Sequence, residues 1–165
     1  MNKAITLIGF ILLNGLSVQN VYANQTAEIE ISHAYVREVP PISPTSAGFM
    51  TIKNLTNKAI KIIGAESKVA EKTELHNHTN DKGVMRMRQV PFIEIPASGI
   101  VKLKPAGLHI MLIGLKQPIK NGQQVTITLQ LENGHKKEIN MPVKSMKNCH
   151  KHSNQHADHN HSHHH

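Results

Sequence analysis

The stretch QQVTITLQLENGHKKEINMPVK, residues 123–144, contains two alternating segments joined by a turn. Every second residue from Val125 to Leu131 is apolar, so these side chains share one face of an extended strand. Asn133-Gly134 is a strong signal for a two-residue hairpin turn, and residues 136–144 supply the returning strand. The stretch therefore predicts an antiparallel β-hairpin with one buried face.

The same alternation with a period of two continues through the preceding residues. We expect further strands at 29–38, 48–54, 59–67, 73–79, 84–90, 92–96, 100–105 and 108–115. The sequence Asn-Asp-Lys-Gly at 80–83 predicts a tight turn, and no segment has a helical period. About nine or ten short strands with frequent turns predict an all-β fold, either an antiparallel β-sandwich or a Greek-key barrel.

The N-terminus has the pattern of a secretory signal. Lys3 is followed by a short apolar region at 4–16, and Val21-Tyr22-Ala23 ends on a small residue. We expect cleavage near Ala23, a periplasmic location and no stable membrane insertion afterwards. An uncleaved anchor is the alternative. No cysteine lies near the cleavage site, so no lipid attachment is predicted. The folded domain should then span 24–146.

The charge balance is basic, with a net charge of +8, but the composition does not favour nucleic-acid binding. Lysines are scattered, and aromatic residues make up only 3% of the chain, so a stacking surface for bases is lacking. Cys149 is the only cysteine, which excludes an internal disulfide. We expect a monomer held together by packing.

The composition changes abruptly after Met146. Residues 147–165 carry eight of the thirteen histidines and no aliphatic residue larger than alanine, so this tail should be disordered without a ligand. A purification tag is the alternative explanation. Imidazole alone selects poorly among Cu(II), Zn(II) and Ni(II), and Cu(II) is our expectation here. The candidate secondary ligands in the tail are Cys149, His150, His152, His156, His159, His161, His163, His164 and His165.

Three strands of the domain each carry a pair of metal-ligating side chains two residues apart. The pairs are His76 with His78, Met85 with Met87, and His109 with Met111. Residues i and i+2 point to the same face of a strand. Imidazole with thioether suits copper, because thioether is a soft ligand that favours Cu(I). Spacing alone does not choose between His76 and His78, or between Met85 and Met87.

The four-residue pattern His76, ten residues, Met87, twenty-one residues, His109, one residue, Met111 resembles the signature of the periplasmic copper chaperone family PCuAC. The flanking segments SAGFMTIKN, TELH, GVMRMR and KPAGLHIMLIGL are also similar, and the resemblance covers about 27–145. It implies a cupredoxin-like fold. It also implies one Cu(I) bound by these four residues. His78 and Met85 are nearby additional donors, and we expect them to form a secondary or transit site.

The resemblance further implies delivery of copper to the dinuclear copper centre of cytochrome c oxidase. Delivery would occur directly to the copper-bearing subunit or with a thiol-containing copper chaperone. A partner that offers thiolates can take the ion by ligand exchange, without redox chemistry in the chaperone.

Other functions fit the sequence less well. A blue-copper carrier needs a cysteine ligand followed by an axial methionine, and no methionine follows Cys149. A metal buffer that acts mainly through the tail is the alternative function. A metal-free structural module leaves the His/Met pairs unexplained. We do not expect an enzyme, because no nucleophile has an adjacent base and no carboxylates cluster.

Overall fold

A computed structural model of the protein describes residues 28–145. The predicted signal segment, the predicted tail and Met146 lie outside the described residues. Within the described range every regular element is a strand, and no helix is long and apolar enough to cross a membrane. The strands are β1 (Ile29–Arg37), β2 (Thr45–Asn54), β3 (Ile60–Glu66), β4 (Ala70–Asp81), β5 (Val84–Gln89), β6 (Ile93–Ile95), β7 (Ile100–Leu103), β8 (His109–Leu115), β9 (Gln124–Leu131) and β10 (Lys136–Lys144).

The β9–β10 hairpin lies where the sequence predicts it, but its loop is longer by one residue. The backbone N–H of Leu131 donates to the carbonyl of His135 across 2.9 Å, so the loop contains Glu132, Asn133 and Gly134. Gly134 has φ 84°, a left-handed conformation that glycine adopts without strain. The two-residue turn was therefore the wrong loop type; a three-residue loop with glycine at its end is the next most common solution.

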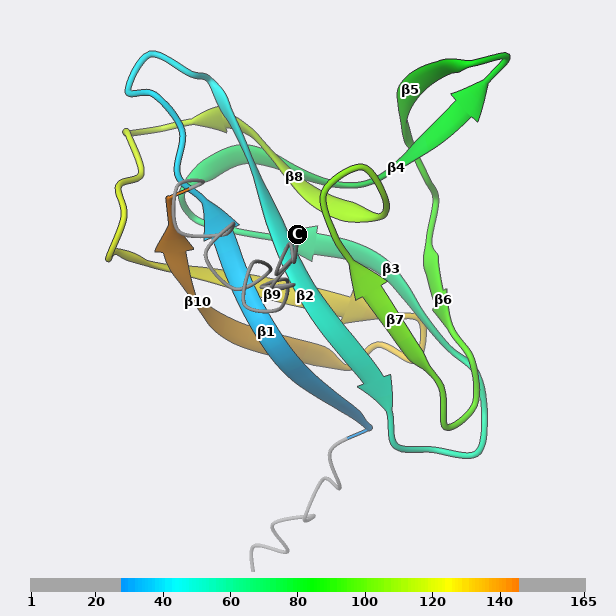
Figure 1. Cartoon of the computed structure of the whole chain (residues 1–165). Helices are drawn as coiled ribbons and strands as arrows, with labels where there is room; N and C mark the ends of the chain where they lie inside the picture. Colours follow the sequence, from blue (N-terminus) through cyan, green and yellow to red (C-terminus); the bar gives the residue numbers. More distant parts are fainter. Residues whose placement is uncertain (1–27, 146–165) are drawn as a thin grey trace, which may run out of the picture.

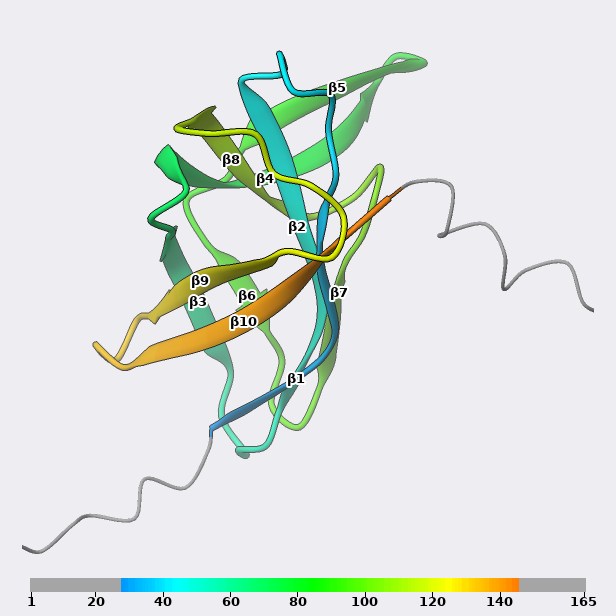
Figure 2. The same ribbon diagram turned by 90° about the vertical axis from the view of Figure 1, so that its left-hand side faces the viewer.

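The strands form one continuous sheet in the order β5-β4-β8-β2-β1-β10-β9-β3-β6, with β7 also paired to β2. The sheet folds back on itself, so β9, β10 and β3 lie behind β1, β2 and β7 (Figures 1 and 2). This arrangement confirms the predicted all-β sandwich. One pairing departs from the antiparallel prediction: β1 and β10 are parallel, with Val36 opposite Val143 and Arg37 opposite Lys144.

The main core lies between the two layers. Ile52 of β2, Ile62 of β3 and Ile127 of β9 are fully buried. Gly48 of β2 shows how closely the layers approach, because a Cβ at this position would lie 3.1 Å from Cδ1 of Ile127. With no disulfide among the described residues, the buried apolar area supplies the main favourable contribution to folding.

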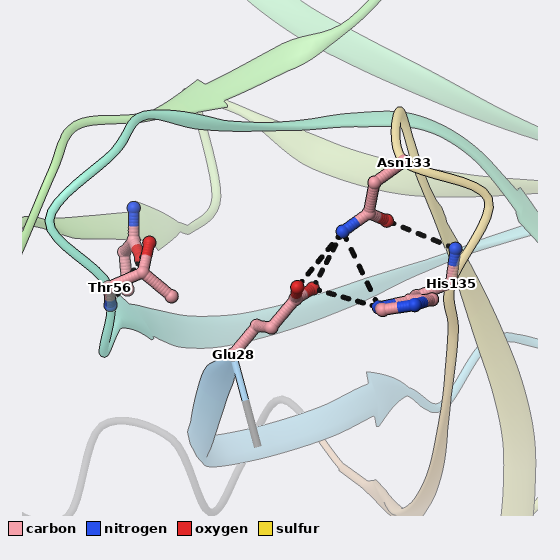
Figure 3. A network of polar contacts seen from close by, with 5 residues as sticks. Glu28, Thr56, Asn133 and His135 are labelled. Atoms are coloured by element: carbon pink, nitrogen blue, oxygen red, sulfur yellow. Dashed lines mark hydrogen bonds and ion pairs between the residues drawn. The ribbon is translucent and has the colours of Figure 1, made fainter. Parts of the chain in front are cut away.

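A network of polar contacts closes the end of the sandwich where β1 begins. The Asn133 amide donates to both carboxylate oxygens of Glu28, at 3.0 and 2.9 Å, and Nδ1 of His135 lies 3.2 Å from Glu28 Oε2 (Figure 3). Nearby, the buried side-chain amide of Asn54 donates to the carbonyls of Lys58, Ile95 and Pro96. The polar side chains at this end are therefore well supplied with partners.

Candidate metal centre

The alternation of β8 separates the main core from the candidate ligands. Ile110 and Leu112 are fully buried members of the core. His109 and Met111 are displaced by one residue, so they point to the other face of the sheet. Ala47 of β2 lies directly opposite Met111 in the pairing of β2 with β8. The candidate ligands of β8 therefore lie on the outer face of the layer.

The neighbouring strand β4 presents its histidines on the same outer face. His76 is the cross-strand partner of His109, and their ring centroids are 5.8 Å apart. Leu75, the preceding residue, is buried in the main core. The strand therefore directs one face to the core while it places its imidazoles beside that of His109 on β8.

The turn between β4 and β5 determines which histidine faces which methionine. Lys82 and Gly83 both have positive φ, 50° and 86°, as a two-residue type I′ turn requires. Asn80 Oδ1 accepts a 2.7 Å hydrogen bond from the backbone N–H of Gly83. This register places His78 opposite Met87. The hairpin projects beyond the rest of the sheet, and β5 is its free edge (Figure 1).

A small pocket of about 90 Å³ forms where these strands meet. Met87, His109 and Met111, three of the four ligands implied by the family resemblance, line it. His78 is the β4 histidine in the lining, whereas His76 lies beside His109 and Met85 is 53% exposed farther out on β5. The remaining lining residues come from β1, from β2 and from the turn before β8: Arg37, Ala47, Phe49, Pro105 and Ala106.

His109 is held in one tautomer by the backbone. Its Nδ1 lies 2.9 Å from the carbonyl oxygen of Gly107; a carbonyl only accepts, so Nδ1 donates its proton and Nε2 keeps the lone pair. The residue is 2% exposed. Burial lowers the pKa of His109, the hydrogen bond to Gly107 opposes this shift, and the nearby His78, His76 and Arg37 lower the pKa further. The structure thus favours the neutral, metal-binding form.

His76 is oriented by a carboxylate. Its Nε2 lies 2.8 Å from Oε2 of Glu74, and the two side chains are 13% and 26% exposed. Nε2 donates to the carboxylate, which leaves the lone pair of the neutral ring on Nδ1. Nδ1 of His76 is buried and has no hydrogen-bond partner, and the same is true of Nδ1 of His78. Metal-ligating histidines characteristically donate their second nitrogen to a carboxylate or a backbone carbonyl, as His76 and His109 do.

The donor types restrict which metals the site can hold. In residues 28–145 no group of three or more His, Cys, Asp or Glu side chains is arranged to hold a metal. A metal on this face would therefore need the thioethers of Met87 and Met111. All four proposed donors are uncharged, a set that suits a soft monovalent ion and is unsuited to Mg²⁺ or Ca²⁺.

Comparison with known proteins gives the family. A family model described as "Putative lipoprotein LpqE-like" matches residues 29–143. The chain belongs to this LpqE-like family. A curated relative, "Putative lipoprotein Lxx21020" from Leifsonia xyli subsp. xyli (strain CTCB07), is 32% identical over 121 residues, which cover 73% of this chain and 72% of the relative.

Solved structures extend the comparison. CuI-DR1885 from Deinococcus radiodurans is 35% identical, with a TM-score of 0.60 over 74% of this chain and 83% of that chain. The copper-bound PCuAC domain from PmoF2 is 19% identical, with a TM-score of 0.62 over 72% of this chain and 94% of that domain. The second match shows the fold alone. The match to CuI-DR1885 shows similarity in sequence as well as in fold.

Two residues that contact the candidate ligands were not predicted from the sequence. Glu74 was not recognised as the orienting partner of His76, although its i, i+2 position on β4 places it on the same face. Phe49, which lines the pocket 6.3 Å from the His109 ring, depends on a pairing between distant strands and had no local signal. The opposition of His78 to Met87, in contrast, follows from a two-residue Lys82-Gly83 loop and was available from the sequence.

Proposed function

We propose that the protein is an exported copper chaperone that binds one Cu(I) through His76, Met87, His109 and Met111. The convergence of imidazole and thioether groups from β4, β5 and β8 on one outer face is the observation that carries this proposal. The 35% identity to a protein whose solved structure contains Cu(I) supports the choice of metal and oxidation state.

Each ligand has a distinct part in the proposed site. His109 binds through Nε2, because Nδ1 donates to Gly107, and His76 binds through the buried Nδ1. Met111 is fixed on the rigid central strand β8, whereas Met87 is 45% exposed on the edge strand β5. The set therefore combines firmly held inner donors with one donor that an approaching protein can reach.

Delivery by ligand exchange follows from these properties. Two thioethers and two neutral imidazoles bind Cu(I) without a charged ligand, so a partner that offers thiolates gains a Coulombic advantage for the monovalent ion. We propose that the partner is the copper-bearing subunit of cytochrome c oxidase or a thiol-containing copper chaperone, and that transfer takes place in the periplasm. The tail residues 147–165 would bind Cu(II) separately.

An anaerobic titration tests this function. The full chain is titrated with Cu(I) in the presence of a chromophoric Cu(I) chelator, and the comparison is with His109→Ala and with Thr79→Ala on the opposite face of β4. We expect the wild type and Thr79→Ala to withdraw one equivalent tightly, and His109→Ala to lose that competition. A wild type that withdraws no copper, or a His109→Ala variant that competes equally well, contradicts the proposal.

A further inference from the structure

The candidate donors form a gradient from the buried interior to the edge of the sheet. His109 on β8 is 2% exposed, the His76 side chain is 13% exposed, and Met87 on β5 is 45% exposed. An ion that enters from solvent therefore meets the β5 side of the site before it reaches His109. The residue opposite Met87 on β4 is His78, which is half-buried.

His78 is one of the residues that line the pocket, whereas His76 is not. His78 lines the pocket with Met87, His109 and Met111, and its ring stacks on that of His109 with centroids 5.2 Å apart. The backbone N–H of His78 donates to the carbonyl of Gly107 across 3.3 Å. That carbonyl also accepts the proton of His109 Nδ1, so one carbonyl fixes both residues relative to each other.

The free nitrogen of His78 indicates a ligand. Nδ1 of His78 is buried without a hydrogen-bond partner, and a buried polar atom left unsatisfied is energetically unfavourable. His76 has a buried Nδ1 as well, but its second nitrogen is tied to Glu74. The two imidazoles of β4 therefore differ: His76 is oriented by a carboxylate beside His109, whereas His78 shares the pocket with the exposed Met87.

We propose that His78 is an exchange ligand, which binds Cu(I) with Met87 as the ion enters or leaves and passes it to His76. The inference rests on the proposed function. In the transfer the bond from copper to His78 breaks as the bond to His76 forms, while Met87 stays attached. Copper remains Cu(I), both imidazoles remain neutral, and no proton or electron is exchanged.

Stopped-flow measurement on the full chain tests this role. Cu(I) is supplied from a chromophoric chelator to measure capture and is withdrawn by excess chelator to measure release. We expect His78→Ala to slow both rates at least tenfold while the equilibrium affinity changes less than threefold. Thr79→Ala, the matched control on the same strand, should behave as the wild type. The tail is identical in all variants, so its contribution cancels.

A second variant separates ligation from packing. His78→Met replaces the imidazole with a thioether, which also binds Cu(I), and we expect it to restore most of the capture rate. Unchanged rates in His78→Ala overturn the proposal, as does a His78→Met variant no faster than His78→Ala. A loss of affinity in His78→Ala as large as in His76→Ala also overturns it, because His78 would then be a resident ligand. If the wild type itself binds no Cu(I), the proposed function fails instead.

Discussion

The two ends of the sandwich use histidine in opposite ways. At the end where β1 begins, His135 contacts Glu28 and Asn133 on a polar surface (Figure 3). At the end of the β4–β5 hairpin, His76 and His78 each keep a buried nitrogen without a partner. Buried polar groups are normally satisfied, so the unsatisfied pair supports the proposed copper site, whereas the satisfied network supports a structural role for the other end. Mutations at the hairpin end should therefore change Cu(I) affinity, and mutations at the end where β1 begins should change stability.

The largest expected effect is on metal binding at the hairpin end. Met87→Leu keeps the size and apolar character of the side chain but removes the thioether. We expect Cu(I) affinity to fall about 100-fold, equivalent to about 2.7 kcal/mol, while stability to urea is nearly unchanged. Chelator competition and urea unfolding measure the two quantities. Met85→Leu on the same strand is the control, and an affinity loss confined to Met85→Leu would contradict the assignment.

The opposite end should show the reverse pattern. Asn54→Ala removes an amide that satisfies three backbone carbonyls, and leaving buried acceptors unpaired should cost about 2 kcal/mol of unfolding free energy. Cu(I) affinity should stay within twofold of the wild type. Urea unfolding is compared with Asn57→Ala, an exposed neighbour in the same turn. Equal stability of the two variants would remove the structural role assigned to Asn54.

A smaller effect should follow from the carboxylate that orients His76. In Glu74→Gln the amide no longer fixes Nε2 as the donor, so both tautomers become accessible. Loss of such an outer partner typically lowers metal affinity 10–100-fold, and we expect a decrease of about tenfold with little change in stability. ¹⁵N shifts of the His76 ring report the tautomer directly. Glu94→Gln, on the distant strand β6, is the control; matching affinities for the two variants would exclude the orienting role.

The smallest effect concerns acid stability at the structural end. Hydrogen bonds from Asn133 and the neighbouring His135 lower the pKa of Glu28 from its ordinary value of 4.5. The folded state therefore binds fewer protons at Glu28 than the unfolded state does, so stability rises with pH in this range. The contribution is complete above about pH 4.5 and is lost as the pH falls through the lower folded-state value. Glu28→Gln should flatten the dependence of urea midpoints on pH below 4.5; an unchanged slope would contradict the network's role.

The sequence predicts the fold well because its alternation is local. Every strand overlaps a predicted segment. The largest differences are in β2, which begins three residues earlier at Thr45, and in β4, which begins three residues earlier at Ala70 and ends two residues later at Asp81. The parallel pairing of β1 with β10 was missed, because it joins residues over 100 positions apart and has no turn signal between them. The loop of the β9–β10 hairpin was misassigned because Asn-Gly serves both the two-residue and the three-residue geometry.

The sequence predicts which residues are candidate donors better than it predicts how the strands bring them together. The i, i+2 pairs identify the donors and the face that they share, since alternation is a property of the strand itself. The neighbour relations of β4 and β8 and the shielding by Phe49 depend on pairings among distant strands. The distinct surroundings of His76 and His78 depend on the same assembly, so spacing alone left the two residues equivalent.

X-ray absorption at the copper edge of the full chain, loaded anaerobically with one equivalent of Cu(I), tests the central claim most directly. The proposed site predicts a first shell with about two nitrogen and two sulfur neighbours, since methionine sulfur and imidazole nitrogen scatter differently. Sulfur should decrease in Met87→Leu. A shell of nitrogen and oxygen alone would place the copper on histidines without the strand methionines and would contradict the account.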